Sequence, residues 1–346
     1  MKLLMITRKV DKNEHLAGFI YHWVKKLGQQ VDELRVISWQ EGDSSGLSDN
    51  IKVFHLPAAA NKFSKILAFQ KILWENIRGV DGIFCHQNPE YTLLAALLAK
   101  IFGKRLVVWY AHGSVSWRLK LAEKLADKII SSSIDSFRLK SKKLVIIGQG
   151  IDTEKFVPGP SESDSPIKNL LTVGRISPTK DYETMIKAVD ILVKDGFKSL
   201  SFSIIGGIGL ALHQVYLDSL QEMVQKMGLA SRVKFLGTVP NDQLPAKLQQ
   251  CDIFLNLSNT GSLDKAVLEA MSCGCLVLTS NEAFKPILNS EFLVEQNNPK
   301  QLAEKIKYLI KLSRDQKDNF GNQLRQEVIN SHNLDNLVKK IVEQFN

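Results

Sequence analysis

Short apolar runs alternate along this chain with longer amphipathic stretches, and a segment rich in Pro, Gly and Ser divides the alternation into two rounds. Runs that are apolar at nearly every position are typical of strands buried on both faces, as in parallel sheets with helices on each side. We therefore predict an α/β protein of two Rossmann-like, doubly wound domains that face each other across a cleft, followed by C-terminal helices.

The break lies at residues 157–166, whose composition suits neither a helix nor a central strand. It places the first domain at 1–155, the linker at 156–167 and the second domain at 168–320. Helices over 321–346 could pack back on the first domain. The expected strands are 3–7, 31–38, 51–56, 82–86, 105–111, 128–133 and 144–148, then 169–174, 200–205, 233–236, 253–257 and 276–279. The expected helices are 15–27, 62–77, 91–102 and 114–126, then 182–194, 212–227, 242–250 and 265–272, with a helical tail from 299.

A chain of 346 residues exceeds what one hydrophobic core usually serves, which agrees with two domains. Its longest apolar run, residues 93–99, is far shorter than the ~18 residues that span a bilayer. The four cysteines lie in apolar stretches without a zinc-like spacing, so we expect buried free thiols in a cytoplasmic protein.

The surplus of positive charge is confined to the first half of the chain. Residues 1–150 hold 23 basic and 13 acidic side chains, a net +10, whereas residues 151–346 hold 22 and 23, a net −1. Nucleic acid, an anionic membrane surface or a phosphorylated substrate would each suit this surplus, and a solubility bias without any partner would also explain it. No helix-turn-helix, zinc-finger or RNA-recognition signature occurs, so we expect no specific nucleic acid.

One segment of the basic half, residues 62–74, interleaves Lys62, Lys65 and Lys71 with large apolar side chains. Such a helix could lie in a membrane interface, as a peripheral contact with anionic lipid at the inner face of the membrane. Ordinary amphipathicity offers another interpretation, in which the helix packs its apolar side chains on the sheet. The side chains that would then be buried are Phe63, Ile66, Leu67 and Leu73.

Gly174 and Arg175 follow the first expected strand of the second domain, and Lys180 comes five residues later, at the start of the next helix. A guanidinium, an ammonium and the free N–H groups of a helix N-terminus together make a strong phosphate site. Loop cations are more often simply solvated, so this pair alone leaves both interpretations open.

A second polar element follows the strand at 253–257 and leads into the helix at 265–272. Its successive N–H groups could also meet an anion. Glu269 lies among apolar helix residues, so its carboxylate needs a partner, either a structural ion pair or the hydroxyls of a ribose. The candidate binding residues of the loop are Ser258, Asn259, Thr260, Gly261 and Asp264. Because both strands end at one edge of the sheet, we expect Arg175, Lys180 and Glu269 to converge.

Four motifs occur in a fixed order: Gly150-Ile-Asp-x-x-x-Phe-x-Pro158, Gly174-Arg-x-x-x-x-Lys180, the loop at 256–265, and Leu-Glu269-Ala-Met-x-x-Gly274. Together they resemble the group 1 glycosyl transferases, family 4 of the retaining transferases with the two-domain GT-B fold. The resemblance covers essentially the whole second domain and is weaker before residue 105.

The resemblance implies that Arg175 and Lys180 grip the diphosphate of a nucleotide-activated sugar and stabilise it as it leaves. It implies that Glu269 holds the ribose hydroxyls. Trp109-Tyr-Ala-His112-Gly113 is similar to the family's histidine-glycine pair, which would place His112 near the donor sugar as a catalytic residue. No Asp-x-Asp triplet occurs, so we expect no metal and no cofactor beyond the nucleotide sugar itself.

Three further residues are weaker candidates for the site, and one position differs from the pattern of the family. Gly206 could let a nucleotide pass close to the backbone or simply form a turn. His86 ends a strand, and His15 could touch acceptor or phosphate. His332 is interpreted as a helix cap. Gly261 stands where the family usually carries the first of two glutamates eight positions apart. Asp264 or Asn259 could replace that contact with the transferred sugar, or the donor could need none.

We therefore predict a retaining, metal-independent glycosyltransferase that moves a sugar from a nucleoside-diphosphate sugar to an acceptor hydroxyl. The acceptor would be a glycan, a lipid-linked saccharide or another polysaccharide precursor, held mainly by residues 1–150, with the donor mainly on 168–320. The alternative, suggested by Gly261, is a non-catalytic nucleotide-sugar-binding protein or partner subunit of the same fold. A nicotinamide dehydrogenase is disfavoured because no G-x-G-x-x-G follows the first strand.

Overall fold

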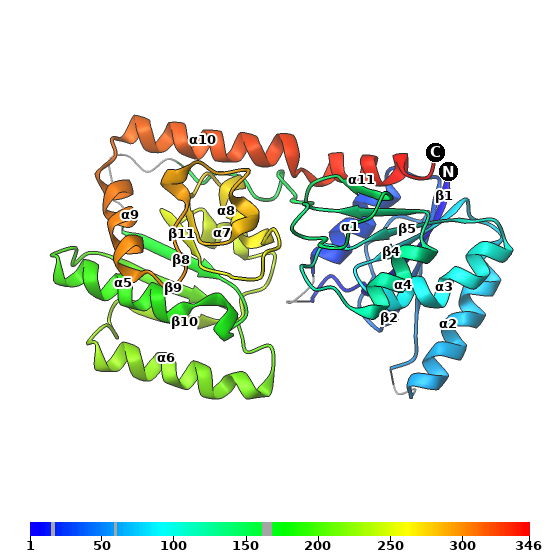
Figure 1. The fold of residues 1–346 in the computed structure, drawn as a ribbon, viewed down its shortest axis with the longest axis horizontal. Coiled ribbons are helices and arrows are strands. Elements are labelled where there is room, and N and C mark those ends of the chain that lie inside the picture. The colour runs from blue at the N-terminus through cyan, green and yellow to red at the C-terminus, as the bar shows by residue number, and fades with distance from the viewer. Residues whose placement is uncertain (15–17, 59–60, 161–167) are drawn as a thin grey trace. The chain divides into compact units, whose positions relative to one another are not determined.

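The computed structural model describes residues 1–14, 18–58, 61–160 and 168–346. The chain divides into two compact units, each built on a parallel sheet (Figure 1). Unit 1 comprises Met1–Asp152 and His332–Asn346, and unit 2 comprises Thr153–Ser331. Residues 161–167 of the expected linker, and His15, lie outside the described residues. In the described part of the chain, no helix combines the length and apolarity needed to cross a membrane.

The sheet of unit 1 has seven strands in the order β3-β2-β1-β4-β5-β6-β7, all paired in parallel. Each predicted strand of the first round is present. Their bounds are β1 (Lys2–Lys9), β2 (Glu33–Gln40), β3 (Ile51–His55), β4 (Gly82–His86), β5 (Arg105–Trp109), β6 (Lys128–Ser131) and β7 (Leu144–Ile146). The central strands are buried on both faces, which is why they read as continuous apolar runs.

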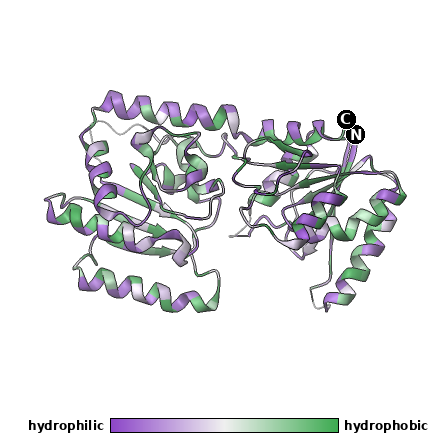
Figure 2. Ribbon diagram, in the orientation of Figure 1, coloured by the Kyte–Doolittle hydropathy of each residue, from purple (hydrophilic) through white to green (hydrophobic). Residues whose placement is uncertain are grey.

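Helices cover both faces of this sheet. One core cluster joins the sheet to α1 (Phe19–Gly28) and α11 (Leu334–Glu343). The other joins the opposite side chains of the same strands to α2 (Lys62–Ile77), α3 (Pro89–Ile101) and α4 (Trp117–Leu125). In Figure 2 the helices alternate between purple and green along their length, as expected for helices with one face on a sheet and one in solvent.

The expected packing of α2 is wrong for two of its residues. The helix buries Phe69, Leu73 and Ile77, whereas Phe63 is 70% exposed and Leu67 is 55% exposed. Buried positions four residues apart define one face of the helix, and Phe63 and Leu67 lie on a different face. The sequence pattern could not separate the two faces because both are apolar.

The interpretation of His332 as a helix cap is also wrong. Asn333 caps α11, with its side chain accepting a hydrogen bond from the N–H of Asn336. His332 is buried, and its Nδ1 accepts a hydrogen bond from the N–H of Gln149 at 3.0 Å. Burial lowers the pKa of His332 to about 4, so the ring is neutral at neutral pH.

Unit 2 contains a five-stranded parallel sheet in the order β10-β9-β8-β11-β12. Its strands are β8 (Asn169–Val173), β9 (Ser201–Ile205), β10 (Val233–Gly237), β11 (Ile253–Asn256) and β12 (Leu276–Thr279). Its α-helices are α5 (Tyr182–Lys194), α6 (Gln214–Lys226), α7 (Leu244–Leu248), α8 (Lys265–Ser272), α9 (Pro299–Lys311) and α10 (Arg314–Ser331). The bounds of α5, α8 and β12 are those predicted from the sequence.

Helix α10 ties the entering segment of unit 2 to α8. The Arg325 guanidinium donates hydrogen bonds to the carbonyl oxygens of Phe156 at 2.9 Å and Thr153 at 3.3 Å, and to that of Ser272. Gly321 lies against the carbonyl of Gly274, where an added Cβ would come within 2.6 Å of the oxygen. Phe156, placed in the linker by the sequence, is therefore buried in unit 2.

All four cysteines are free, as expected from the sequence, and Cys251 is half-buried rather than buried. Burial raises the pKa of the Cys85 thiol to about 12, so this thiol stays protonated and unreactive.

Candidate functional site

The candidate site is built on the carboxyl edge of the unit 2 sheet. Strands β8, β9 and β11 are parallel neighbours, so the residues that follow them share one edge. Gly174 and Arg175 follow β8, Gly206 follows β9, and the loop at 257–264 follows β11. The loops after β8 and β11 touch, because the N–H of Asn259 donates to the carbonyl of Thr179 at 3.2 Å.

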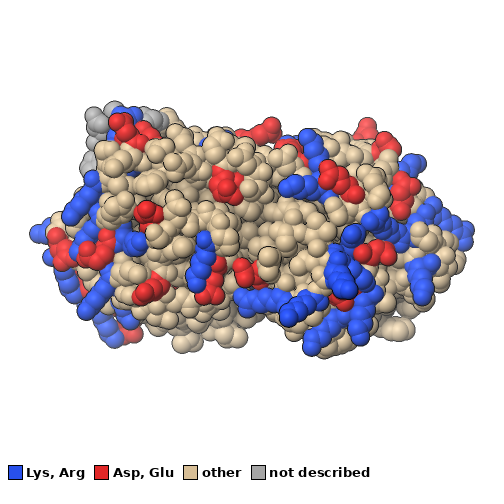
Figure 3. All heavy atoms as spheres, turned by 45° about the horizontal axis from the view of Figure 1, so that its top comes forward, with Lys and Arg blue, Asp and Glu red and all other residues tan. Residues whose placement is uncertain are grey.

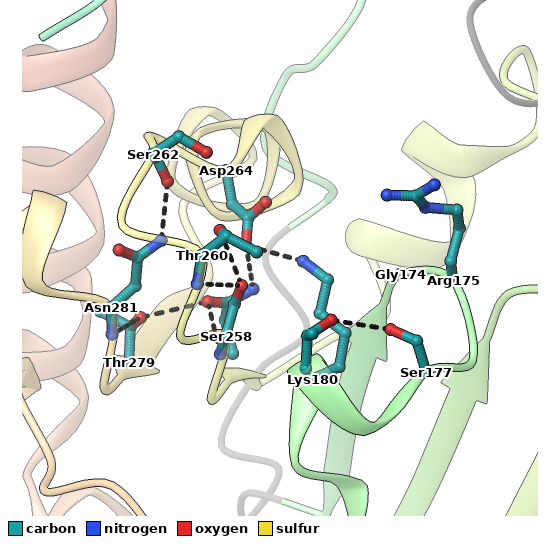
Figure 4. Close-up of polar contacts among 12 residues, drawn as sticks. Gly174, Arg175, Ser177, Lys180, Ser258, Thr260, Ser262, Asp264, Thr279 and Asn281 are labelled. Atoms are coloured by element: carbon teal, nitrogen blue, oxygen red, sulfur yellow. Dashed lines mark hydrogen bonds and ion pairs between the residues drawn. The ribbon is translucent and has the colours of Figure 1, made fainter. Parts of the chain in front are cut away.

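Lys180 reaches from the first of these loops to the second. It ends the short 3-10 helix η1 (Pro178–Lys180), and its Nζ lies 2.8 Å from Oδ2 of Asp264. The same carboxylate oxygen accepts a hydrogen bond from Nδ2 of Asn256 at 3.0 Å. The Lys180 side chain is 14% exposed and that of Asp264 is 21% exposed, so the pair is largely shielded from water. Figure 4 shows this contact between the end of β8 and the loop before α8.

Arg175 is the exposed cation of the site. In Figure 4 its side chain extends to the same side of the β8 end as that of Lys180. Within the part of the chain that the structure describes, its guanidinium makes no hydrogen bond or ion pair. Its alkyl stem passes Gly209, where an added Cβ would lie 3.1 Å from Cδ. All five guanidinium N–H groups are therefore available to an anion.

Tyr182 fixes the turn that carries Arg175. Its buried O–H bonds the carbonyl oxygens of Gly174 at 2.8 Å and Arg175 at 3.2 Å. Burial raises the pKa of Tyr182, so the phenol keeps its proton. The absent side chain of Gly174 makes room for the Lys180 stem, whose Cε would lie 3.3 Å from an added Cβ.

Gly206 packs its backbone against the turn at Gly174 and Arg175. Its φ is +149°, and an added Cβ would come within 1.8 Å of the carbonyl oxygen of Gly174. The close approach that its missing side chain permits is thus to the backbone of the neighbouring loop, which differs from the simple turn that the sequence also allowed. Its contact with a nucleotide stays a prediction.

Three successive N–H groups at the start of the loop after β11 are already hydrogen-bonded. The N–H of Ser258 donates to Oδ1 of Asn256, that of Asn259 to Thr179, and that of Thr260 to Oγ of Ser258. Side chains occupy the amides of Ser258 and Thr260, and the neighbouring loop occupies that of Asn259. Anion binding by the rest of the loop stays a prediction.

Gly261 follows in this loop with a φ of +65°. A glutamate at this position would have to adopt a left-handed conformation, at a cost of about 1–2 kcal/mol. This backbone conformation suits glycine and accounts locally for the departure from the family's pattern.

Glu269 lies within α8, one turn after Lys265 and five residues after Asp264. It is 8% exposed, and the Nζ of Lys265 is buried. Burial raises the pKa of Glu269, a shift that the charges of Lys265 and Lys155 oppose. Burial likewise lowers the pKa of Lys265 to about 7, opposed by Glu269. Lys265 and Lys155 are therefore the cations whose charges act on the carboxylate, and both the ion pair and the contact with a ribose stay predictions.

His112, the candidate of unit 1, is exposed just beyond β5. Its backbone N–H donates to the carbonyl of Ser136 at 2.9 Å, and its ring Nδ1 accepts a hydrogen bond from the backbone N–H of Ser114 at 3.1 Å. Nε2 is therefore the ring nitrogen that makes no hydrogen bond within the described residues. His86, by contrast, is 1% exposed, with Nδ1 3.0 Å from Oγ1 of Thr7, which assigns it to the core.

Sequence reasoning missed the buried polar groups that hold the loops in place. Asn281 donates from Nδ2 to the carbonyl of Ser262 at 2.8 Å, and Thr279 donates from Oγ1 to Oδ1 of Asn256 at 3.3 Å (Figure 4). Asn256 and Thr279 end the neighbouring strands β11 and β12. Polar residues at the carboxyl ends of strands were the signal that could have revealed them.

A cavity of about 370 Å³ adjoins the same loops. Pro178 and Asn259 line it together with Asp181 and Glu183, whereas neither Arg175 nor Lys180 does. Lys187 is the one cation among the lining residues, against the two carboxylates, so the cavity does not share the cations of the candidate diphosphate site.

Comparisons with known proteins agree with this geometry. The family model of the glycosyl transferases group 1 matches residues 153–327. A GDP-mannose-dependent alpha-(1-6)-phosphatidylinositol monomannoside mannosyltransferase from Mycolicibacterium smegmatis is 25% identical over 55% of this chain and 56% of its own. A UDP-Gal:alpha-D-GlcNAc-diphosphoundecaprenol alpha-1,3-galactosyltransferase from Escherichia coli is 22% identical over 86% of this chain and 84% of its own. The chain thus spans little more than half of the first relative.

Solved structures show the same fold. HepE from Anabaena, in complex with UDP and glucose, superposes with a TM-score of 0.80 at 18% identity, over 99% of each chain. A glycosyltransferase from Rickettsia africae gives a TM-score of 0.80 at 17% identity, over 99% of this chain and 97% of that one. Two parallel-sheet α/β domains of the GT-B type, predicted from the sequence, are confirmed. Since the family model spans half of the chain and includes Arg175, Lys180 and Glu269, this chain belongs to the group 1 glycosyl transferases.

Proposed function

We propose that this chain is a retaining glycosyltransferase that moves a sugar from a nucleoside-diphosphate sugar to an acceptor hydroxyl without a metal ion. The observation that carries the proposal is the pair of cations at one sheet edge, the exposed Arg175 and the shielded Lys180. Two cations beside parallel strand ends suit a diphosphate better than a neutral ligand.

Charge development supports this assignment. When the bond between the anomeric carbon and the phosphate oxygen breaks, negative charge grows on the departing diphosphate. Preorganised cations lower the barrier because they meet that charge without reorganising. Arg175, held by the Tyr182 hydroxyl on its backbone, and Lys180 would supply this stabilisation.

In this proposal the configuration at the anomeric carbon is retained, because the acceptor attacks the same face of the sugar from which the diphosphate departs. The acceptor oxygen bonds the anomeric carbon, and its proton passes to the departing phosphate oxygen. Glu269 would hold the ribose hydroxyls, and His112 would orient the donor sugar or the incoming hydroxyl through Nε2. A solved structure in complex with UDP and glucose, and relatives named for phosphatidylinositol and diphosphoundecaprenol acceptors, support a nucleotide-sugar donor and a lipid-linked acceptor.

The second candidate, a nucleotide-sugar-binding protein without turnover, is favoured by Gly261. Its positive φ leaves no carboxylate where the family usually faces the transferred sugar. Asp264, three residues later and bonded to Lys180, is the group that could replace it.

A thermal-shift screen against nucleoside diphosphates and their sugars identifies the donor, because a ligand of the folded state raises the melting temperature. Turnover of the best donor is then measured in Arg175→Ala and Lys180→Ala. We expect each variant to lose on the order of 10²–10³-fold in rate, as when an oxyanion-stabilising group is removed. Lys194→Ala, a 72% exposed cation of α5, is the matched control.

Full turnover in Arg175→Ala would refute the assigned role. Nucleotide-sugar binding by the unmodified chain, with neither transfer nor donor hydrolysis, would establish the binding protein instead.

A further inference from the structure

Exposed apolar side chains gather on three neighbouring helices of unit 1. They repeat at helical spacing within each helix, so each forms a stripe. On α2, α3 and α4 the exposed fractions range from 41% to 70%. The residues are Phe63, Leu67 and Trp74 on α2, Leu97 and Ile101 on α3, and Trp117, Leu121 and Leu125 on α4. We call this set, with the cations on the same helices, the α2–α4 surface.

The three helices form one layer. They pack through a common core cluster on one face of the unit 1 sheet, and Figure 1 shows them together on one side of it. Gln70 donates from Nε2 to the carbonyl of Leu94 at 2.9 Å, joining α2 to α3. Arg118 pairs with Glu90 at 3.0 Å, joining α4 to α3. The stripes are therefore parts of a single outer surface.

Cations flank the apolar stripes. Positive side chains outnumber negative ones on these helices and the residues directly after them. The cations are Lys62, Lys65, Lys71, Arg78, Lys100, Lys104, Arg118, Lys120, Lys124 and Lys128, and the carboxylates are Glu75, Glu90, Glu123 and Asp127. On the face drawn in Figure 3, blue predominates over red across unit 1, at the right, whereas unit 2 shows both signs mixed.

A groove of about 730 Å³ lies in this surface, between the ends of α3 and α4. Lys100, Lys104, Arg105 and Lys124 line it, with Asp127 as the acidic residue. The Asp127 carboxylate accepts a hydrogen bond from the N–H of Leu106 at 2.7 Å, so it is held at the backbone. The Arg105 guanidinium donates to the carbonyl of Asn346 at 2.6 Å, so Lys100, Lys104 and Lys124 are the cations that give the groove a positive potential suited to a phosphate headgroup.

We propose that the α2–α4 surface rests on an anionic lipid bilayer, with the α3–α4 groove holding a lipid phosphate. Isolated exposed apolar residues are ordinary, but contiguous stripes edged by lysine are typical of helices that lie in a membrane interface. Apolar side chains such as Trp117 enter the headgroup boundary while lysines meet the lipid phosphates. Nucleic acid would use the cations and leave eight large apolar side chains in water, so lipid fits the surface better.

The assignment extends the expectation that residues 62–74 alone form the membrane contact. Helix α2 contributes Phe63, Leu67 and Trp74, but α3 and α4 carry the groove and five of the eight exposed apolar side chains. The surface lies wholly within unit 1, whereas the cationic pair of the proposed donor site lies in unit 2. Membrane binding can therefore fail without affecting donor binding, and the reverse also holds.

The test is co-sedimentation of the full chain with vesicles of phosphatidylcholine, with and without phosphatidylglycerol. We expect binding to the anionic vesicles alone, weakened by added salt. Lys100→Gln, Lys104→Gln and Lys124→Gln together should weaken it on the order of a hundredfold, since each cation near the surface contributes about a fivefold factor. A second variant, Trp117→Ser with Leu121→Ser, should weaken binding while leaving its salt dependence unchanged.

Matched controls in unit 2 are the lysine variant Lys194→Gln with Lys226→Gln and Lys285→Gln, and the apolar variant Leu212→Ser with Val215→Ser. All five side chains are more than 60% exposed. Melting temperature and nucleoside-diphosphate binding verify that each variant is folded.

Unchanged vesicle binding in both unit 1 variants overturns the proposal, as does equal binding to neutral vesicles. Binding to heparin without binding to vesicles also overturns it and assigns the surface to a soluble polyanion.

Discussion

Replacing Asp264 by asparagine should move stability and diphosphate affinity in opposite directions. In the structure Asp264 accepts hydrogen bonds from Lys180 at 2.8 Å and Asn256 at 3.0 Å. The variant removes the charge from a largely shielded pair while keeping the shape of the side chain. A hydrogen bond to a charged group contributes about 1.5–3 kcal/mol, and we expect the lower end because both side chains retain some exposure.

Diphosphate binding should improve in the same variant. A phosphate held by Lys180 would lie roughly 5 Å from the Asp264 carboxylate, where two unit charges repel by about 0.8 kcal/mol in bulk water and about 3 kcal/mol at an effective dielectric constant of 20. Asp264→Asn should therefore bind a nucleoside diphosphate at least about fourfold more tightly, as measured by calorimetry. The fall in stability is measured by denaturant unfolding of the same protein.

Asp190→Asn is the matched control, because Asp190 pairs with Lys194 at 2.6 Å on α5 outside the candidate site. It should leave diphosphate affinity unchanged. Weaker or unaltered diphosphate binding by Asp264→Asn would refute the reasoning. If Asp264 also contacts the donor sugar, the variant binds the nucleotide sugar more weakly and the bare diphosphate more tightly, which separates the two roles.

Three further predictions concern the residues that shape the site. Tyr182→Phe removes the hydrogen bonds to the carbonyls of Gly174 and Arg175, and should lower the free energy of unfolding by about 1–3 kcal/mol and weaken diphosphate binding. Gly206→Ala should destabilise unit 2 by more than about 1 kcal/mol, because its Cβ would lie 1.8 Å from the carbonyl oxygen of Gly174; circular dichroism melting tests this. Lys265→Met should abolish a rise in stability between about pH 7 and 10.5, seen in unfolding curves across that range.

The direction in which Lys265 changes the stability with pH follows from the difference between its folded and unfolded pKa. Its pKa is lowered to about 7 in the folded chain from the usual 10.5. Between these values the unfolded chain binds the proton that the folded chain has released, so stability rises with pH in that window. A pH dependence shared by wild type and Lys265→Met would contradict the burial of this amine. For Tyr182→Phe and Gly206→Ala, unchanged melting would contradict the contacts from which they are argued.

Much of the fold was predictable because strands that are buried on both faces of a sheet are apolar at nearly every position. Strand β4 at Gly82–His86 and helix α8 at Lys265–Ser272 have the predicted bounds. The edge that carries Arg175 and Lys180 also followed from strand order, since parallel strands place their carboxyl ends together.

The details of the site were not predictable because they depend on contacts between distant residues. The partner of Lys180 is 84 positions away, and no local pattern identifies Asp264 as that partner. The amides of Ser258 and Thr260 are bonded by side chains whose rotamers depend on tertiary packing. The exposure of Phe63 was missed for a similar reason, because an apolar helix with two candidate faces does not reveal which one is buried.

The last helix of the chain, α11, belongs to unit 1, the unit that is translated first. Residues Leu334, Leu337, Val338 and Ile341 of α11 complete the core that the first strands begin. A chain leaving the ribosome can close unit 2 once Ser331 has emerged, whereas the earlier-made unit 1 still lacks its last helix. The half translated first is therefore the half that finishes folding last, and until then it exposes the apolar face that a chaperone would recognise.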